Sequence, residues 1–80
     1  MKLTILGPGC WGLTLAWLLN NNFDEITVWG REQDLYDELV INKHCPKPLD
    51  IQLDKKVVIT SDLKSAIHNA DIILSVVATS

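Results

Sequence analysis

Three glycines near the start of the chain have a spacing that is typical of a phosphate-binding turn. Gly7, Gly9 and Gly12 form the pattern G-x-G-x-x-G. In such a pattern the first glycine permits a tight turn, the second lets the backbone approach a pyrophosphate, and the third lets a helix pack closely on a strand. The free N–H groups and the dipole at the helix start then face the phosphates. The pattern alone is weak evidence, so its flanks decide whether it binds a dinucleotide.

The segments that flank the glycines are an apolar strand and an apolar helix. We expect the strand at 3–6 and the helix at 10–20, where a run of asparagines ends it because Asn tolerates the left-handed cap conformation. A dinucleotide loop needs a strand before it and a helix after it. The context therefore predicts that this loop holds a dinucleotide.

The rest of the chain continues the alternation of strand and helix. Runs of β-branched and apolar residues predict strands, and apolar residues at i,i+4 spacing predict helices. Two prolines, Pro46 and Pro48, interrupt the pattern. We expect strands at 25–29, 57–60 and 71–77, helices at 33–42 and after the expected N-cap Ser61, and a loop at 49–56.

The element order βαβαβαβ predicts an α/β fold, a doubly wound parallel sheet of Rossmann type. Right-handed crossovers and the glycine pattern after the first strand imply the strand order 3-2-1-4. A complete dinucleotide domain adds further strands beside the fourth, and the apolar run 71–77 would otherwise form an exposed edge. We therefore expect 1–80 to be the N-terminal part of a dinucleotide-binding domain, with the substrate domain absent from this chain.

Composition excludes several other classes of protein. The net charge of −3, with no stripe of Lys or Arg, argues against nucleic acid as a partner. No apolar run reaches the length of a membrane span, and no apolar signal sequence follows Met1. Cys10 and Cys45 form no C-x-x-C motif and are expected to be free thiols. These features together predict a cytoplasmic enzyme segment.

The residues after the second strand bear on the choice of cofactor. An NAD-selective site places Asp or Glu at the end of this strand to hold the ribose 2′-hydroxyl. Here the sequence is Val28-Trp29-Gly30-Arg31, and an arginine suits a 2′-phosphate. This favours NADP, or tolerance of both NADP and NAD. Glu32 could still reach a ribose hydroxyl, and the alternative for Arg31 is a solvated loop charge.

The aromatic residues and Cys10 allow more than one interpretation. Trp11 either packs the helix on the sheet or lies close to the ligand, and these roles are compatible. Cys10 is expected to matter through its backbone N–H rather than as a nucleophile. Trp17 and Trp29 are expected to belong to the core rather than to a cofactor site.

No metal site is predicted. His44 and Cys45 are adjacent but have no second pair of ligands, so a surface loop is the better interpretation. His68 is expected to face solvent. The backbone of 78–80 follows the carboxyl end of the fourth strand, where open α/β sheets bind ligands, and could line the pocket of the nicotinamide ribose.

The tryptophan within the glycine pattern and the run Trp29-Gly30-Arg31 carry a family resemblance. They resemble the N-terminus of bacterial NAD(P)-dependent glycerol-3-phosphate dehydrogenases, and Asn42, Pro48-Leu49, 58–63 and 70–74 agree. The loop at 46–53 looks like the cyanobacterial branch. The resemblance implies that the pyrophosphate lies over the glycine turn, that the tryptophan flanks it and that Arg31 meets the adenosine. The cofactor-binding residues it implies are Gly7, Gly9, Cys10, Trp11, Gly12 and Arg31.

The resemblance also implies a reaction for the longer protein. That reaction is the reversible reduction of dihydroxyacetone phosphate to sn-glycerol 3-phosphate, which supplies phospholipid synthesis, and the full-length protein could be a homodimer. The catalytic lysines of the family lie downstream, so no residue of this chain is assigned a catalytic role and the fragment alone should be inactive.

Two alternatives remain. One is a ketopantoate- or 6-phosphogluconate-type dehydrogenase, against which the tryptophans at 11 and 29 count. The other is a non-enzymatic nucleotide-sensing domain, which would be expected to carry an acidic residue after the second strand.

Overall fold

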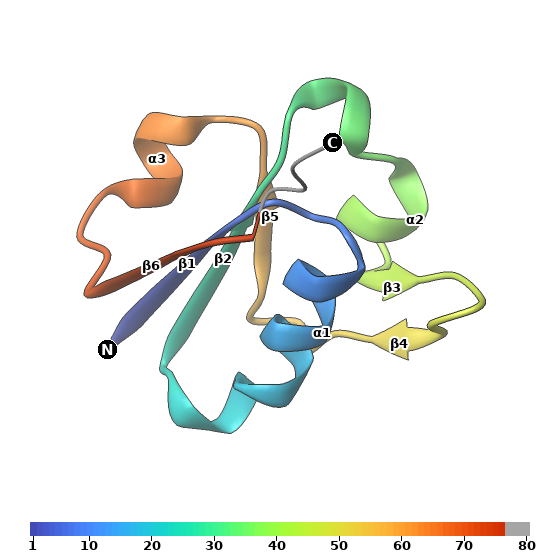
Figure 1. Cartoon of the computed structure of the whole chain (residues 1–80), viewed down its shortest axis with the longest axis horizontal. Coiled ribbons are helices and arrows are strands. Elements are labelled where there is room, and N and C mark those ends of the chain that lie inside the picture. Colours follow the sequence, from blue (N-terminus) through green and yellow to red (C-terminus); the bar gives the residue numbers. More distant parts are fainter. Residues whose placement is uncertain (77–80) are drawn as a thin grey trace.

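The central feature of the computed structural model, which describes residues 1–76, is a four-stranded parallel sheet (Figure 1). The strand order is β5-β2-β1-β6, and every neighbouring pair is parallel. This confirms the predicted order 3-2-1-4. The strands are β1 (Lys2–Leu6), β2 (Glu25–Trp29), β5 (Val58–Thr60) and β6 (Ile72–Ser75).

Strand β1 lies inside the sheet and is covered on both faces. Leu3, Thr4 and Ile5 are fully buried, and the Thr4 hydroxyl donates a hydrogen bond to the carbonyl of Ala66. Burial on both faces explains why no charged residue alternates with Leu3 and Ile5, and why the buried hydroxyl of Thr4 has a hydrogen-bond partner. The strand that leads into the glycine turn is therefore held from both faces and by a paired strand on either side.

Helices cover the sheet from two sides (Figure 1). The helix α1 (Cys10–Leu18) lies with α2 (Asp37–Val40) on one side, and α3 (Leu63–Ile67) lies on the other. Leu13 and Ala16 are the side chains through which α1 enters the core. The predicted helix 10–20 ends at Leu18, and the asparagines after it form the 3-10 turn η1 (Asn20–Asn22).

The prediction of one continuous helix at 33–42 is wrong. The segment contains the 3-10 turn η2 (Glu32–Asp34), two extended residues and the single turn α2. Leu35 has an extended backbone, with φ of −99° and ψ of 146°, and packs against the core. Leu39 in α2 is fully buried. The burial of both leucines is therefore favoured over the backbone hydrogen bonds of one continuous helix.

The segment expected to be a loop also contains regular structure. β3 (His44–Cys45) and β4 (Ile51–Gln52) pair as a two-stranded antiparallel hairpin. Strands of two residues give no periodic signal in a sequence, and the prolines between them suggest only a turn. Cys45 and Leu53 from this hairpin segment are buried in the core.

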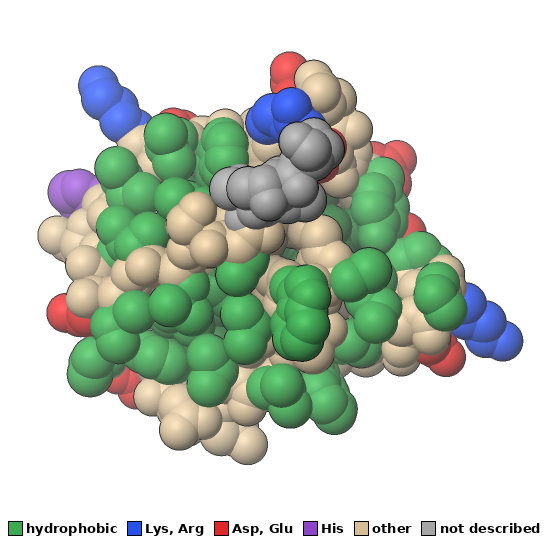
Figure 2. Space-filling model, viewed as in Figure 1, with side chains coloured by type: hydrophobic (Ala, Val, Ile, Leu, Met, Phe, Trp, Pro, Cys, Tyr) green, Lys and Arg blue, Asp and Glu red, His purple; other side chains and the backbone are tan. Residues whose placement is uncertain are grey.

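The last helix and strand are only partly covered. Asp62, not the expected Ser61, caps α3 by accepting a hydrogen bond from the Ser65 N–H. Leu63 and Ile67 on this helix are exposed, as are Ile72 and Ile73 on β6. Figure 2 shows apolar side chains gathered over this part of the surface. The apolar edge predicted for the fourth strand is therefore present, while residue 77 of that prediction lies outside the described residues.

No helix among the described residues is long and apolar enough to cross a membrane.

Candidate cofactor-binding site

The turn between β1 and α1 is built from backbone in close contact. Gly7 has a φ of 123°, a conformation that side chains rarely adopt, and its N–H donates to the carbonyl of Trp29 at 2.8 Å. A Cβ on Gly12 would lie 1.9 Å from the carbonyl oxygen of Gly7. The first and third glycines of the pattern therefore pack α1 against the strand end, as their spacing predicts.

Gly9 differs from the other two glycines. Its φ of −67° and ψ of −177° are open to any residue, and a Cβ built on it would meet nothing within 4 Å. Neither backbone strain nor a neighbouring atom of the described chain requires glycine here. The space in front of Gly9 is what a pyrophosphate close to the backbone would occupy.

The N-terminus of α1 is open to an anion. Gly9 is the N-cap, no side chain caps the helix, and its first turn carries no acidic residue. The first hydrogen bond of the helix runs from the Leu13 N–H to the Gly9 carbonyl at 3.0 Å. The N–H groups that precede Leu13 in the helix point out of its end, where the helix dipole favours negative charge. Cys10, the first residue of the helix, is exposed.

The tryptophans lie mostly outside the core. Trp11 is 73% exposed, so it does not anchor α1 on the sheet and its ring is free to contact a ligand. Trp17 is 52% exposed, and its predicted place in the core is wrong. Trp29 is half-buried, and its indole N–H donates to the carbonyl of Ser61 at 2.9 Å.

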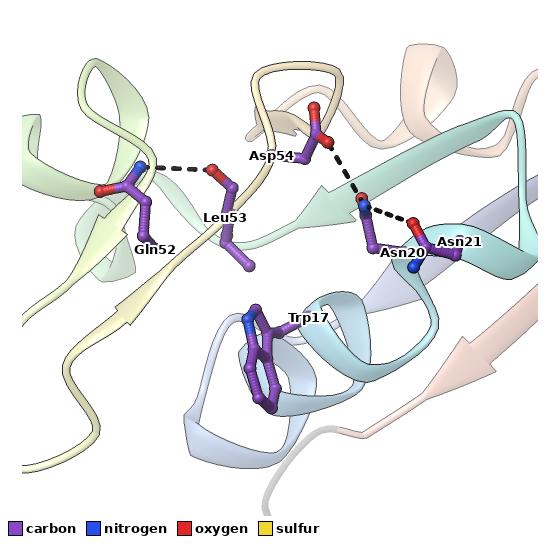
Figure 3. Close-up of a pocket in the computed structure, with 6 residues that line it drawn as sticks. All are labelled: Trp17, Asn20, Asn21, Gln52, Leu53 and Asp54. Atoms are coloured by element: carbon purple, nitrogen blue, oxygen red, sulfur yellow. Dashed lines mark hydrogen bonds between the residues drawn. The ribbon is translucent and has the colours of Figure 1, made fainter.

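Trp17 instead borders a cavity at the other end of α1. This cavity has a volume of about 340 Å³ and lies between the end of the helix and the segment that follows β4 (Figure 3). Its polar wall includes a hydrogen bond from the Asn20 amide to the Asp54 carboxylate at 3.3 Å. The cavity is lined by Trp17, Asn20, Asn21, Gln52, Leu53 and Asp54. It lies away from the glycine turn and holds none of the predicted site residues.

The loop after β2 contacts the glycine turn through Gly30. A Cβ on Gly30 would lie 2.5 Å from Cγ of Pro8 and 3.1 Å from Cδ2 of Leu35. The Gly30 N–H also donates to the carbonyl of Thr60 at 3.1 Å. Sequence reasoning assigned no role to Gly30, although a glycine directly before the arginine of interest was a usable signal. Gly30 lets the loop that carries Arg31 lie directly against the glycine turn.

Arg31 is exposed and paired. Its Nε donates to the Asp34 carboxylate at 3.0 Å, and the two side chains are 65% and 33% exposed. Arg31 is therefore a solvated charge of the loop after β2, but one that a neighbouring carboxylate holds in place. Glu32, the other residue considered near the ribose, is exposed at the start of η2.

His44 is not the surface-loop residue that the sequence suggested. It is half-buried in β3, and its ring nitrogens lie 2.7 Å from carboxylate oxygens of Glu38 and Asp50. The hydrogen bond to Asp50, followed by that to Glu38, raises the pKa of His44, and the bond from His44 lowers the pKa of Glu38. This cluster ties α2 to the hairpin at a distance in sequence from the glycine pattern.

The thiols and His68 match their predicted states, except that Cys45 is buried in β3 rather than placed in a surface loop. Both cysteines are free, and burial raises the pKa of the Cys45 thiol. His68 is exposed. Among residues 1–76, no group of three or more His, Cys, Asp or Glu side chains could hold a metal ion. The predicted contact of 78–80 with a ribose lies outside the described residues.

A family model matches the chain at residues 2–80. Its description is NAD-dependent glycerol-3-phosphate dehydrogenase N-terminus. Curated relatives carry the name glycerol-3-phosphate dehydrogenase [NAD(P)+]. One from Streptococcus uberis is 44% identical over 98% of this chain, and one from Thermoanaerobacter sp. is 38% identical over 92%. The matched regions are 23% and 22% of those proteins, so the chain spans less than a quarter of their length.

A solved structure has the same arrangement of elements. The crystal structure of glycerol-3-phosphate dehydrogenase from Coxiella burnetii superposes with a TM-score of 0.76 at 28% sequence identity. The match covers 95% of this chain and 24% of that protein.

Proposed function

We propose a function that proceeds from the family: this chain belongs to the NAD-dependent glycerol-3-phosphate dehydrogenases, and it forms the first part of their dinucleotide-binding domain. The cofactor is NAD or NADP, and it supplies the hydride chemistry when bound. The chain's own contribution is to bind and orient that cofactor. The open space at Gly9, beside an uncapped helix end, is the observation that carries this proposal.

The six predicted site residues share three tasks in this proposal: shaping the turn, binding the pyrophosphate and meeting the adenosine end of the cofactor. Gly7 and Gly12 set the turn and hold α1 against β1. Gly9 leaves the backbone accessible, and the first-turn N–H groups, including those of Cys10 and Trp11, donate to the pyrophosphate. The exposed ring of Trp11 flanks the cofactor, and Arg31 meets its adenosine end.

The whole enzyme would interconvert dihydroxyacetone phosphate and sn-glycerol 3-phosphate. Residues beyond this chain would supply the catalytic lysines and the substrate domain, so residues 1–80 alone should show no turnover. We also propose a cytoplasmic, homodimeric enzyme that serves phospholipid synthesis. The ketopantoate- and 6-phosphogluconate-type alternatives and the sensor alternative are not favoured, because the family match extends over nearly the whole chain.

Arg31 favours NADP over NAD. No carboxylate follows β2 directly, and a guanidinium is the side chain best suited to a 2′-phosphate. Parallel assays of the full-length enzyme with dihydroxyacetone phosphate and either NADPH or NADH test both the reaction and this preference. Absence of turnover with both cofactors would overturn the proposed reaction.

The substitution Gly9→Ala tests the proposed site in the full-length enzyme. A methyl group there meets no protein atom but would stand between the backbone and the pyrophosphate. We expect the Kd for NADPH, measured by calorimetry, to rise by at least about tenfold while the melting temperature stays near that of the parent. Leu18→Ala, an exposed change at the far end of the same helix, is the control and should leave the Kd unchanged. An unchanged Kd in Gly9→Ala would contradict the proposed site.

A further inference from the structure

Arg31 does not stand alone, because the backbone fixes an acidic partner beside it. The Asp34 N–H donates to the Arg31 carbonyl at 2.8 Å, which closes the 3-10 turn η2. Arg31 is the N-cap of this turn, and the hydrogen bond brings its backbone close to that of Asp34. Within the closed turn the Asp34 carboxylate accepts a hydrogen bond from Arg31 Nε at 3.0 Å.

The turn is also anchored against the glycine loop. Leu35, directly after η2, packs on the core and approaches Gly30, which in turn contacts Pro8. The Leu35 N–H donates to the Glu32 carbonyl at 3.2 Å. These contacts hold the loop that carries Arg31 and Asp34 against the glycine turn. An exposed ion pair contributes little to stability, so its consequence is to be sought in binding.

The pair limits what the guanidinium can offer to a ligand. With Nε occupied by Asp34, Arg31 can present only its two terminal nitrogens to a phosphate. The Asp34 carboxylate also places a negative charge next to the cation, and that charge opposes a 2′-phosphate more than a 2′-hydroxyl.

We propose that Asp34 is a specificity-determining residue that acts through Arg31: it restrains and partly neutralises the guanidinium, and so reduces the preference for NADP over NAD. This inference rests on the proposed function, because it assumes that Arg31 meets the adenosine end of the cofactor. Asp34 is a positioning residue in this scheme. It selects between two cofactors without taking part in the reaction.

The test is the ratio of kcat/KM with NADPH to kcat/KM with NADH in the full-length enzyme. In Asp34→Asn the Arg31 guanidinium loses its adjacent negative charge, so we expect the ratio to rise about tenfold. Asp34→Glu keeps the carboxylate and should keep the ratio near the parent value. Asp37→Asn is the matched control: it removes the same charge three residues later, and the Asp37 side chain makes no hydrogen bond within the described residues.

A double substitution separates action through Arg31 from a direct effect. In an Arg31→Gln background, Asp34→Asn should change the ratio by less than about twofold. A rise of the same size in that background, an equal rise in Asp37→Asn, or no rise in Asp34→Asn would each overturn the inference. Calorimetric Kd values for NADPH and NADH accompany the kinetics. If the parent binds neither dinucleotide, the proposed function fails; if it binds both and the ratio does not respond, only this inference fails.

Discussion

Two regions of the molecule are held together in contrasting ways. The glycine region, residues 2–18, relies on backbone contact: Gly12 lies against the Gly7 carbonyl, and no side chain caps α1. The hairpin region, residues 37–53, relies on polar side chains, with His44 bridging Glu38 and Asp50. The first region leaves the start of α1 without a side-chain cap, while the second uses its polar side chains to bond to one another.

This difference separates the region that we propose binds the cofactor from one whose polar side chains bind each other. Contacts between backbone atoms depend on side-chain size and are indifferent to pH. Bridges between ionised side chains depend on pH and tolerate changes in size. A larger side chain at a tightly packed glycine should therefore lower the stability of the glycine region. Loss of the proton from His44 should lower the stability of the hairpin region.

The largest expected effect is that of Gly12→Ala. Its methyl group would lie 1.9 Å from the Gly7 carbonyl oxygen, and neither backbone segment can move without breaking the turn. We expect the free energy of unfolding to fall by more than about 3 kcal/mol, the upper end of the cost of overpacking. The melting temperature of the full-length enzyme should fall accordingly. Gly9→Ala is the matched comparison, since it makes the same change in open space. Equal melting temperatures for the two variants would contradict the account of the turn.

A smaller effect is expected at Gly30, where the loop carrying Arg31 meets the glycine region. In Gly30→Ala the methyl group would press on the rigid ring of Pro8 and on the more adaptable Leu35. We expect a destabilisation of about 1–3 kcal/mol in urea unfolding. If the contact with Pro8 is responsible, combining Gly30→Ala with Pro8→Ala should recover part of the loss. If the double variant recovers none of the lost stability, the contact with Pro8 is not the cause of the loss.

The hairpin region should lose stability as the pH rises. The bonds to Asp50 and Glu38 raise the pKa of His44, so its contribution is complete below the pKa of the unfolded chain, about 6.5, and disappears as pH rises through the higher folded pKa. Glu38, whose pKa His44 lowers, contributes above its unfolded pKa of about 4.3 and loses that contribution as pH falls through its folded pKa. The bridge is therefore strongest between about pH 4.5 and 6.5.

The measurement is the melting temperature of the parent and of His44→Gln from pH 5 to pH 9. The difference between them should be largest near pH 5–6 and shrink toward pH 9. His68→Gln is the control, because it removes an exposed histidine whose ring makes no hydrogen bond within the described residues. A constant difference across this pH range would show that His44 acts through packing rather than charge.

The smallest effect concerns the two thiols, one in each region. Cys10 is exposed, whereas Cys45 is 7% exposed and burial raises the pKa of its thiol. Because the thiolate is the reactive form, alkylation followed by peptide mass analysis should label Cys10 first and Cys45 only after unfolding. Saturating NADPH should slow the labelling of Cys10 alone. Equal rates of alkylation of the two cysteines in the folded protein would contradict the burial of Cys45.

The same contrast explains which features the sequence predicted. The strand order and the glycine turn follow from residue types at fixed spacing, so the amino-acid sequence alone is enough to predict them. The hairpin could not be predicted, because its two-residue strands carry no period and its bridges depend on how Glu38, His44 and Asp50 meet in space. The continuous helix at 33–42 was wrong because the burial of Leu35 beside Gly30 takes precedence over local helical spacing.

The predicted site divides in the same way. The packing roles of Gly7 and Gly12 could be predicted from spacing, whereas the pairing of Arg31 with Asp34 depends on a 3-10 turn that helical periodicity did not indicate. The exposure of Trp17 also escaped prediction, because hydrophobic size alone does not fix the direction in which a helix presents a side chain. The exposure of Trp11 agrees with one of the two roles that the sequence left open for it.

The central position of β1 has a consequence for the order of assembly on the ribosome. β1 pairs on one side with β2, which follows soon after it, and on the other with β6, where the partner of Leu3 is Ile72. A nascent chain can close the glycine turn and the β1–β2 pair early, since Leu3 pairs there with Ile26, which lies much nearer in sequence than Ile72. The other edge of β1 must wait for β6 to emerge, and until then it is an unpaired apolar strand that nearby chains could join.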